Sequence, residues 1–173
     1  LSASTAEMGV GLLLAASRRI IEGDRIMRAG EFSGWKVDLL LGSELNGKTL
    51  GILGCGRIGQ TIARIAMGFE MEVLYRNRNR LPHELESRLR LTSVDFDRLV
   101  DQSDFLIITA PLNEESHHLF DLKTFERMKS SAILVNIGRG PVIKESDLVI
   151  ALERNLIAGV ALDVLESPPN MAA

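Results

Sequence analysis

Short apolar runs alternate with amphipathic stretches over most of the chain after residue 48. The runs FLIIT (105–109) and AILVN (132–136) are apolar at consecutive positions, which is typical of strands buried on both faces of a parallel sheet. The pattern predicts strands at 49–54, 72–75, 105–109, 132–136 and 157–162, and helices at 58–69, 96–102, 122–128 and 146–153. Strands separated by helices indicate βαβ units. The expected fold class is therefore α/β, a doubly wound parallel sheet of Rossmann type with its ligand at the carboxyl ends of the strands.

The first 46 residues follow a different pattern. Residues 5–28 are rich in good helix formers and place Leu12, Ala16 and Ile20 on one side, which predicts one long helix. Glycines recur between 29 and 48, so a loop is expected there. We therefore expect one dinucleotide-binding domain over 1–173, with an interdomain helix and linker at 1–46 and a Rossmann core at 47–173. The helix has more apolar residues than one face needs, which favours burial on two sides, and packing within one chain is the alternative: Leu12, Leu13, Leu14, Ile20, Ile21 and Ile26.

Composition and charge exclude several classes of protein. A content of 46% hydrophobic and 25% charged residues is ordinary for a globular domain, and 173 residues can bury a sizeable core. The formal net charge of −3 argues against a general binder of nucleic acid or of membrane surfaces. No apolar run approaches the roughly 20 residues of a membrane helix. The one cysteine, Cys55, allows no internal disulfide, so we expect a cytoplasmic protein, without a metal site.

A glycine turn joins the first strand of the core to the next helix. Gly54, Gly56 and Gly59 form G-x-G-x-x-G between the strand LGIL and the helix RIGQTIARIA. In such a turn the first glycine permits the tight bend, the second lets a pyrophosphate approach the backbone, and the third allows close packing of helix on strand. Arg57 and Ile58 lie at the helix start, where free N–H groups favour phosphate. The alternative is a tight turn that binds no ligand.

The second strand of the core ends without an acidic residue. NAD-binding folds usually place Asp or Glu there to accept hydrogen bonds from the ribose 2′-hydroxyl. This chain has YRNRNR at 75–80, with Asn77, Arg78 and Arg80 and no carboxylate in reach. A carboxylate would repel a 2′-phosphate, whereas an arginine fork binds one. The segment favours NADP(H) over NAD(H), and a solvated turn without a specific role is the alternative.

Three later segments follow strands and are expected to meet at one crevice: TAPL (109–112), NIGRGP (136–141) and GVALDV (159–164). Arg139 stands between two glycines, so its guanidinium has room to enter a cleft. There it could pair with a substrate carboxylate and polarise the adjacent carbonyl. A surface-loop arginine is the alternative.

The sequence resembles the D-2-hydroxyacid dehydrogenase family. The resemblance is carried, in the family's order, by TAE (5–7), LLLAASRRI (12–20), LNGKTLGILGCGRIGQ (45–60), SDFLIITAPLNEESHHLF (103–120), MKSSAILVNIGRGPVI (128–143) and AGVALDV (158–164). The run N-x-G-R-G is more specific than the glycine turn. Within the family, the chain looks most like the glyoxylate/hydroxypyruvate and 2-ketogluconate reductases, whose members commonly use NADPH.

The resemblance implies a role for each motif. Arg139 would bind the carboxylate and carbonyl of a small 2-oxo acid, and Asp163 would lie near the nicotinamide. Ala110, Pro111 and Ile137 would line the cofactor. Hydride transfer to the 2-oxo carbon would give a D-2-hydroxy acid, with the protein orienting the two reacting carbons. The first helix would connect two domains and contribute to a homodimer.

The chain departs from the family in its histidines and in its extent. The family's proton-donating histidine follows the last strand of the cofactor domain, and this sequence ends before that point. The chain's own histidines are not expected to replace it: His83, His117 and His118. The family's substrate domain is also absent from this sequence. We therefore expect the chain to bind NADP(H) without turning over a 2-oxo acid on its own.

The acid that partners the family's histidine is also displaced. It usually lies about five residues after Asp163, where this chain has Pro168, so Glu166 is the nearest candidate catalytic acid. Two other functions remain open. Corepressor-like modules of the same family sense nucleotides to control assembly, and NAD-dependent phosphoglycerate-type dehydrogenases share the fold. The missing acid at Asn77 argues against the second.

Overall fold

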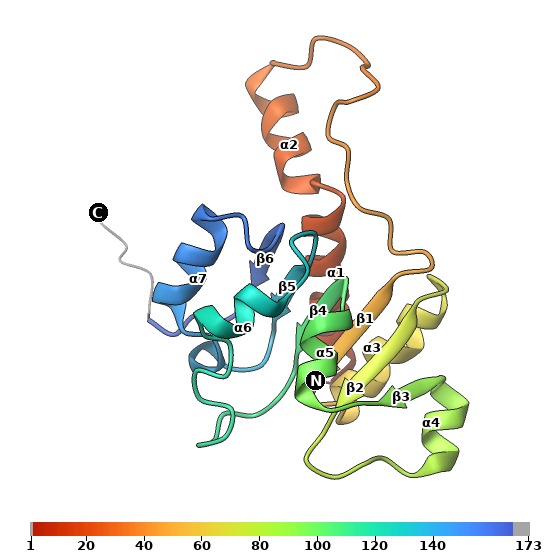
Figure 1. Cartoon of the computed structure of the whole chain (residues 1–173). Helices are drawn as coiled ribbons and strands as arrows, with labels where there is room; N and C mark the ends of the chain where they lie inside the picture. The colour runs from red at the N-terminus through yellow and green to blue at the C-terminus, as the bar shows by residue number, and fades with distance from the viewer. Residues whose placement is uncertain (1, 168–173) are drawn as a thin grey trace.

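A six-stranded parallel sheet forms the centre of the molecule (Figure 1). The computed structural model describes residues 2–167. Along the sheet the order is β3-β2-β1-β4-β5-β6, and every neighbouring pair is parallel. The order reverses between β1 and β4, which creates the crevice where such folds bind ligands. The strands are β1 (Thr49–Leu53), β2 (Glu72–Arg76), β3 (Leu91–Ser93), β4 (Phe105–Ile108), β5 (Ile133–Asn136) and β6 (Gly159–Leu162).

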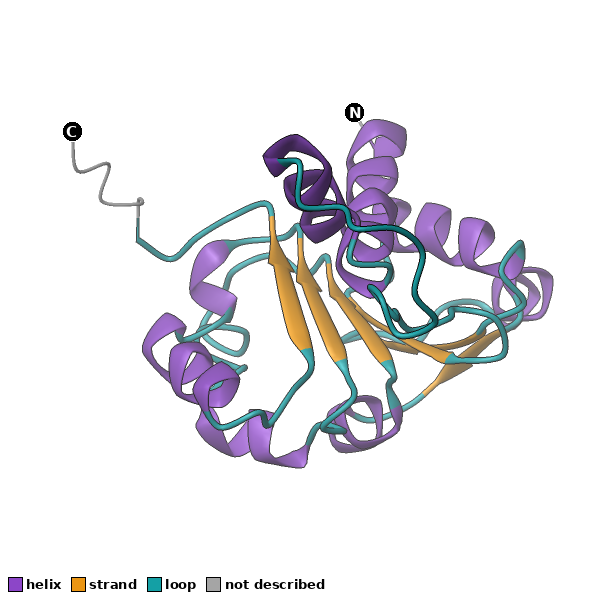
Figure 2. Cartoon of the chain, turned by 90° about the horizontal axis from the view of Figure 1, so that it is seen from above, coloured by secondary structure: helices purple, strands orange, loops and turns teal. Residues whose placement is uncertain are grey.

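Helices cover both faces of the sheet (Figure 2). One apolar core joins the sheet to α1 (Ser2–Ser17) and α3 (Arg57–Met67), and a second joins it to α5 (Phe96–Gln102), α6 (Leu122–Arg127) and α7 (Glu145–Glu153). A short 3₁₀ helix, η1 (Gly140–Val142), precedes α7. The expected α/β class and doubly wound parallel sheet are confirmed.

The apolar runs of the central strands follow from this two-sided burial. In β4, Phe105 and Ile107 belong to the first core, whereas Leu106 and Ile108 belong to the second. Successive side chains of a strand point to opposite faces, so a strand covered on both sides has no polar position. All four residues are at most 1% exposed.

The expected single helix over 5–28 is wrong, because the chain breaks it at Arg19. The structure has α1, then Arg19 in the left-handed conformation with a φ of 54°, then α2 (Ile20–Ala29). The linker returns to this break, where the N–H of Ser43 donates to the carbonyl of Ser17 at 2.8 Å. A Cβ on Gly42 would lie 2.3 Å from the same oxygen. The returning linker therefore donates the hydrogen bond that the carbonyl at the end of α1 would otherwise accept from a further helical turn.

Three short elements were absent from the predicted set: α4 (His83–Leu89), β3 and η1. β3 is an edge strand of three residues, and one of them, Leu91, is buried. So short a segment contains no apolar run. Elsewhere the predicted elements agree with the structure apart from shifts of one or two residues at their ends. No helix in the described part of the chain is both long and apolar enough to cross a membrane.

Candidate functional site

The glycine turn after β1 has the geometry that a pyrophosphate site requires. Gly54 has a φ of 94°, and a Cβ there would lie 2.7 Å from the backbone of Ala110. A Cβ on Gly59 would lie 3.0 Å from Ile52, so this glycine brings α3 close to the sheet. At Gly56 a Cβ would meet nothing within 4 Å, so the backbone faces open space at the start of α3. The turn thus leaves room for a phosphate beside the N–H groups of a helix of 11 residues.

Asn77 closes this turn from the end of β2. The N–H of Cys55 donates to Asn77 Oδ1 at 2.5 Å, and Asn77 Nδ2 donates to the carbonyl of Cys55 at 3.3 Å. Asn77 was expected to lie beside the ribose of the cofactor, and its side-chain amide is hydrogen-bonded to the glycine turn. Cys55 is fully buried, and burial raises the pKa of its thiol to about 12, so it acts as a small packing residue.

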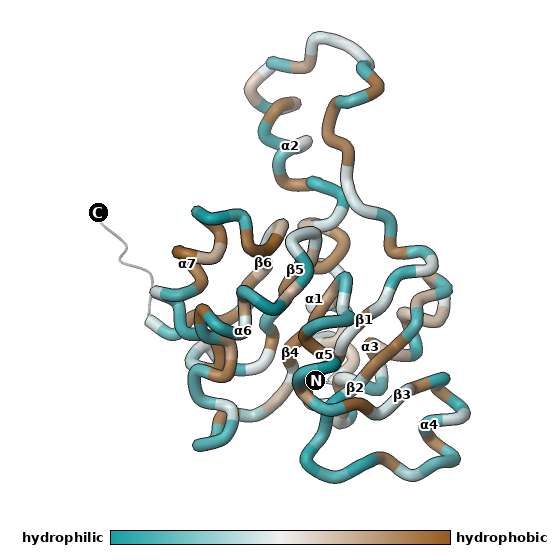
Figure 3. The backbone as a smooth tube through the Cα atoms, viewed as in Figure 1, coloured by the Kyte–Doolittle hydropathy of each residue, from teal (hydrophilic) through white to brown (hydrophobic). Residues whose placement is uncertain are grey.

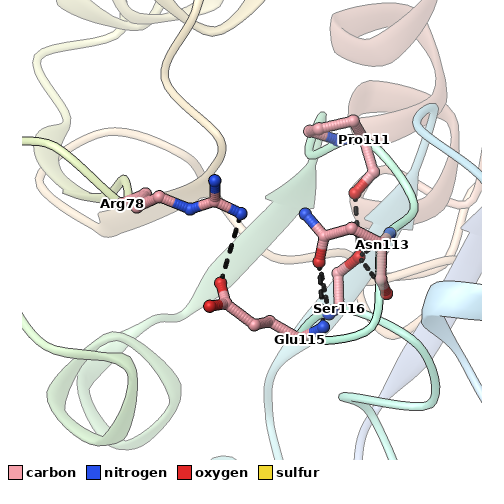
Figure 4. A network of polar contacts seen from close by, with 5 residues as sticks. All are labelled: Arg78, Pro111, Asn113, Glu115 and Ser116. Atoms are coloured by element: carbon pink, nitrogen blue, oxygen red, sulfur yellow. Dashed lines mark hydrogen bonds and ion pairs between the residues drawn. The ribbon is translucent and has the colours of Figure 1, made fainter.

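A cleft of about 750 Å³ opens between the end of β2 and the loop after β4. Arg76 and Arg78 line one side, and residues of the loop 110–119 line the other. Across it, Arg78 Nη2 lies 3.5 Å from Glu115 Oε2, with both side chains at least 70% exposed (Figure 4). The expectation that no carboxylate lies in reach of this segment is wrong, because Glu115 reaches it from 37 residues further along the chain.

The loop that presents Glu115 is held by its own polar groups (Figure 4). Asn113 Oδ1 accepts from the N–H groups of Glu115 and Ser116, both at 3.0 Å. Ser116 Oγ accepts from the N–H of Asn113 and donates to the carbonyl of Pro111, both at 2.8 Å. The loop backbone is therefore fixed, and the Glu115 side chain extends freely from it.

Arg80 is engaged with a carboxylate outside the cleft. It donates from Nε and Nη2 to the two oxygens of Glu86, each at 2.9 Å. Tyr75, which is fully buried, donates its hydroxyl to Glu86 Oε1 at 2.5 Å. The hydrogen bonds from Arg80, and to a smaller extent the one from Tyr75, lower the pKa of Glu86 to about 2, so Glu86 stays charged. Arg80 therefore anchors the segment after β2, and its predicted contact with a 2′-phosphate would require it to leave Glu86.

The N-x-G-R-G motif forms a loop clamped by Asn136, whose role the sequence analysis missed. Asn136 is fully buried at the end of β5. Its Oδ1 accepts from the N–H of Gly138, and its Nδ2 donates to the carbonyl of Arg139, both at 3.0 Å. The spacing of Asn two residues before Gly and three before Arg is the signal for this clamp. Arg139 is exposed, and its Nη1 donates to the carbonyl of Gly138 at 2.8 Å.

The other predicted cofactor residues lie at neighbouring strand ends. Ala110 follows β4 and forms the floor of the turn, since Cβ atoms on Gly54 and on Gly138 would both collide with it. Pro111 follows Ala110 at the cleft, and Ile137 follows β5 and is buried. Asp163 follows β6 and donates its N–H to the carbonyl of Asn136 at 3.0 Å.

Arg57 is exposed and Ile58 half-buried at the start of α3. The predicted residues other than Arg80 and Glu166 therefore lie along one edge of the sheet, at the carboxyl ends of β1, β2, β4, β5 and β6.

Glu166 has a different partner from the one its candidate catalytic role would need. Its Oε1 contacts His118 Nε2, and its Oε2 accepts from the N–H of Glu145 at 3.2 Å. The contact with His118 lowers the pKa of Glu166, and the hydrogen bond from the N–H of Glu145 lowers it further. Its role as a catalytic acid stays a prediction. Pro168, where the acid would be expected, lies outside the described residues.

Comparison with known proteins identifies what the chain resembles. Residues 10–173 match the family model described as "D-isomer specific 2-hydroxyacid dehydrogenase, NAD binding domain". A protein of Staphylococcus aureus (strain MRSA252), provisionally named a 2-hydroxyacid dehydrogenase, is 45% identical over 168 residues, which are 97% of this chain and 53% of that protein. The chain thus spans about half the length of the curated relatives it matches.

Solved structures give the same result. A D-isomer specific 2-hydroxyacid dehydrogenase from Polaromonas sp. superposes with a TM-score of 0.93 at 38% identity, covering 98% of this chain and 53% of that one. A glyoxylate reductase from Paecilomyes thermophila gives 0.88 at 40% identity, covering 98% and 51%. A D-lactate dehydrogenase with NAD⁺ from Lactobacillus jensenii gives 0.84 at 32% identity, covering 96% and 49%.

Proposed function

Because the chain belongs to the family of D-isomer specific 2-hydroxyacid dehydrogenase NAD-binding domains, we propose that it is the cofactor domain of an NADPH-dependent reductase. Its substrate would be a small 2-oxo acid of the glyoxylate or hydroxypyruvate type, and its product a D-2-hydroxy acid. The observation that carries the cofactor choice is the cleft beside β2, where Asn77 stands in place of the usual acid and Arg76 and Arg78 flank it. The 40% identity to a glyoxylate reductase supports the substrate class.

The residues present fit a dinucleotide. Gly56 opens onto free space at the start of α3, where Arg57 adds a positive charge beside the pyrophosphate. Arg78 offers a planar fork to a 2′-phosphate, and its side chain is 70% exposed and free to turn. Among the described residues that line the cleft, Glu115 is the only carboxylate. It is 77% exposed, so it can turn into solvent when a phosphate enters.

The chemistry would take place at the ends of β5 and β6. When bound, the nicotinamide supplies the hydride. Arg139 would leave the Gly138 carbonyl, pair with the substrate carboxylate and stabilise negative charge on the carbonyl oxygen. The Asn136 clamp holds the backbone on both sides of that arginine, so the guanidinium moves on a fixed base.

The projecting α2 and linker support a homodimer of the full-length protein. α2 projects from the rest of the molecule (Figure 1), and none of its residues, all of which are described, is buried. A helix of 10 residues is marginal in water by itself. Apolar residues extend along this arm (Figure 3), and Trp35 is 81% exposed and Val37 73% exposed. Burying such an arm against a second copy would explain its composition. Analytical ultracentrifugation of the full-length protein tests this, and a monomer at micromolar concentration would contradict it.

The cofactor proposal is tested with fragments that differ in a single group. 2′,5′-ADP and 5′-AMP differ only by the 2′-phosphate, so titration calorimetry of each with the chain isolates its contribution. One charge-assisted contact should make 2′,5′-ADP bind about tenfold or more tighter, because hydrogen bonds to charged groups contribute about 1.5–3 kcal/mol. NADPH should show the same preference over NADH. Equal affinities for 2′,5′-ADP and 5′-AMP would contradict the proposed preference for NADP(H).

One observation favours an NAD-dependent dehydrogenase instead. The Glu115 carboxylate already offsets the charge of Arg78, which reduces the attraction for a second anion. Tighter binding of NADH than of NADPH would select this alternative. With either cofactor, the chain alone should not reduce glyoxylate or hydroxypyruvate in a steady-state assay, since it spans about half of its relatives. Clear turnover would overturn that expectation.

A further inference from the structure

Three side chains with metal-ligand chemistry meet outside the cofactor cleft. They are His117 and His118, from the loop after β4, and Glu166, from the segment after β6. One ligand atom of each lies within 4.8 Å of the other two. His117 is exposed, and the side chains of His118 and Glu166 are 32% and 26% exposed, so an ion from solvent can reach them. None of the three is among the cleft-lining residues.

The carboxylate is already oriented for a ligand. Glu166 Oε2 accepts from the N–H of Glu145 at 3.2 Å, which leaves Oε1 facing His118. Glu166 in turn donates its own N–H to Glu145 Oε1 at 2.5 Å. These two reciprocal bonds fix both the backbone and the carboxylate plane. Carboxylates that bind metals are usually held by outer partners in this way.

The two imidazoles are also held on one side of their loop. His118 has a φ of 51°, a left-handed conformation that non-glycine residues rarely adopt. Its N–H donates to the carbonyl of Pro141 at 2.8 Å, and the nearby Phe120 is fully buried, so the surrounding chain imposes this conformation. The rings of His117 and His118 have centroids 3.9 Å apart and planes 34° apart. In an extended strand, two consecutive side chains would point to opposite sides.

We propose that His117, His118 and Glu166 bind one divalent transition-metal ion, with Zn²⁺ as the best match. Two imidazole nitrogens and one carboxylate oxygen suit Zn²⁺, which binds them at about 2.0–2.2 Å and accepts water as a fourth ligand. Ligand atoms around a tetrahedral ion lie roughly 3.4 Å apart at those bond lengths. The ligand atoms of the three residues already lie within 4.8 Å of one another, and the ion would replace the direct contact between His118 and Glu166.

The bound ion would clamp two segments that lie 48 residues apart in the sequence. It would join the loop after β4 to the segment after β6, which the Glu145 bonds already tie to the start of α7. Gly140 packs in the same region, since a Cβ there would lie 1.9 Å from the carbonyl oxygen of Leu165. The ion would act as a structural clamp beside the Arg139 loop. This inference is independent of the cofactor and substrate proposed above.

Metal-free protein is required for the test. The chain is treated with a chelator, freed of it, and titrated with ZnCl₂ by calorimetry and with CoCl₂ by visible absorption. Wild-type chain should bind one equivalent of Zn²⁺ with micromolar affinity, and Co²⁺ should develop the visible bands of a low-symmetry site. His117→Gln, His118→Gln and Glu166→Gln should each weaken Zn²⁺ binding at least tenfold. The matched control is His83→Gln, which removes the remaining histidine, exposed at the start of α4, and should bind like wild type.

Three results would overturn the proposal. They are the absence of saturable Zn²⁺ binding by wild-type chain, undiminished binding by His118→Gln, and an equal loss in His83→Gln. Circular dichroism and 2′,5′-ADP titration verify that each variant is folded. Because His117 is exposed and its imidazole is not needed for the His118–Glu166 contact, His117→Gln tests the site even if His118→Gln unfolds. Variants that lower only the melting temperature, with no Zn²⁺ bound by wild type, would show an ion pair and no metal site.

Discussion

Two parts of the candidate cofactor site, the glycine turn and the arginine segment, are held in different ways. Contacts with backbone atoms fix the glycine turn, whereas the arginines of the arginine segment (76–80) pair with carboxylates of later segments. In the turn, Gly54 lies against the backbone of Ala110, and the amide of Asn77 bonds to both backbone groups of Cys55. Each of these contacts has a single geometry. The turn is therefore prepared before any ligand arrives.

The arginine segment has partners that it can exchange. Arg78 faces Glu115 across open cleft at 3.5 Å, and Arg80 forms a two-point contact with the largely buried Glu86. An exposed pair contributes little to stability, whereas a two-point pair with a buried carboxylate is specific and strong. One arginine therefore remains available to a ligand while the other holds the segment in place. The glycine turn should be sensitive to added atoms, and the arginine segment to changes in charge.

The largest effect should come from adding one methyl group to the turn. Gly54→Ala would combine a φ of 94° with a Cβ 2.7 Å from the backbone of Ala110. Strain and overpacking together should reduce the free energy of unfolding by about 3 kcal/mol, measured by urea denaturation. The control is Gly47→Ala, which also has a positive φ, 67°, but would meet nothing within 4 Å. Gly47→Ala should reduce the free energy of unfolding by about 1 kcal/mol. Equal losses would show that the Ala110 contact contributes nothing.

A second change should separate the two arginines. Arg78→Ala should weaken 2′,5′-ADP binding about tenfold or more and leave 5′-AMP binding unchanged, because one charge-assisted contact is lost. Arg80→Ala should instead lower the melting temperature, since it leaves the nearly buried Glu86 without its cation. Calorimetry and thermal denaturation measure both quantities for both variants. The distinction fails if Arg80→Ala weakens 2′,5′-ADP binding as much as Arg78→Ala does.

The glycine turn could be predicted from the sequence far better than the contacts of the arginine segment. The glycine spacing, the strand before it and the helix after it lie within about 20 residues, and such local patterns are informative. Glu115 reaches Arg78 from 37 residues away, and the pairing of β1 with both β2 and β4 brings the two loops together. The pairing of Arg80 with Glu86 depends on α4, a helix that no apolar periodicity marked.

The same reasoning applies to the break at Arg19. Residues 5–28 are rich in good helix formers, yet the returning linker interrupts the helix at Arg19 through Ser43. Asn136 could have been predicted from the spacing of N-x-G-R-G, because a buried amide beside a glycine loop needs backbone partners. Contacts between segments that are distant in the sequence could not be predicted from the spacing of residues.

Acid should loosen the arginine segment through Glu86. Its pKa is lowered to about 2 by Arg80 and Tyr75, so the charged carboxylate stabilises the fold above the unfolded-state pKa of about 4.3. That contribution is lost as the pH falls from about 4.3 through about 2. Glu86→Gln should therefore show a shallower decline in melting temperature over this window. Parallel declines in both proteins would contradict the assignment. Asp147→Asn is the positive control, because the pKa of Asp147 is lowered too and its removal should also flatten the decline.

The smallest effect should come from the carboxylate that faces Arg78. Glu115→Gln keeps the size of the side chain and removes the charge that competes with a 2′-phosphate. Because exposed ion pairs contribute at most about 1 kcal/mol, the affinity for 2′,5′-ADP should rise by about threefold. The affinity for 5′-AMP should not change.

Glu114→Gln is the matched control for that substitution, because it removes an equal charge from the adjacent exposed position. A general change in surface charge would raise the affinity for 2′,5′-ADP equally in both variants. A rise confined to Glu115→Gln, and reduced at high salt, would show that Glu115 competes directly for the guanidinium. No rise in either would mean that Glu115 has already turned away before the phosphate arrives. The exposed contact would then have no part in cofactor selection, and Arg78 would act as a free cation.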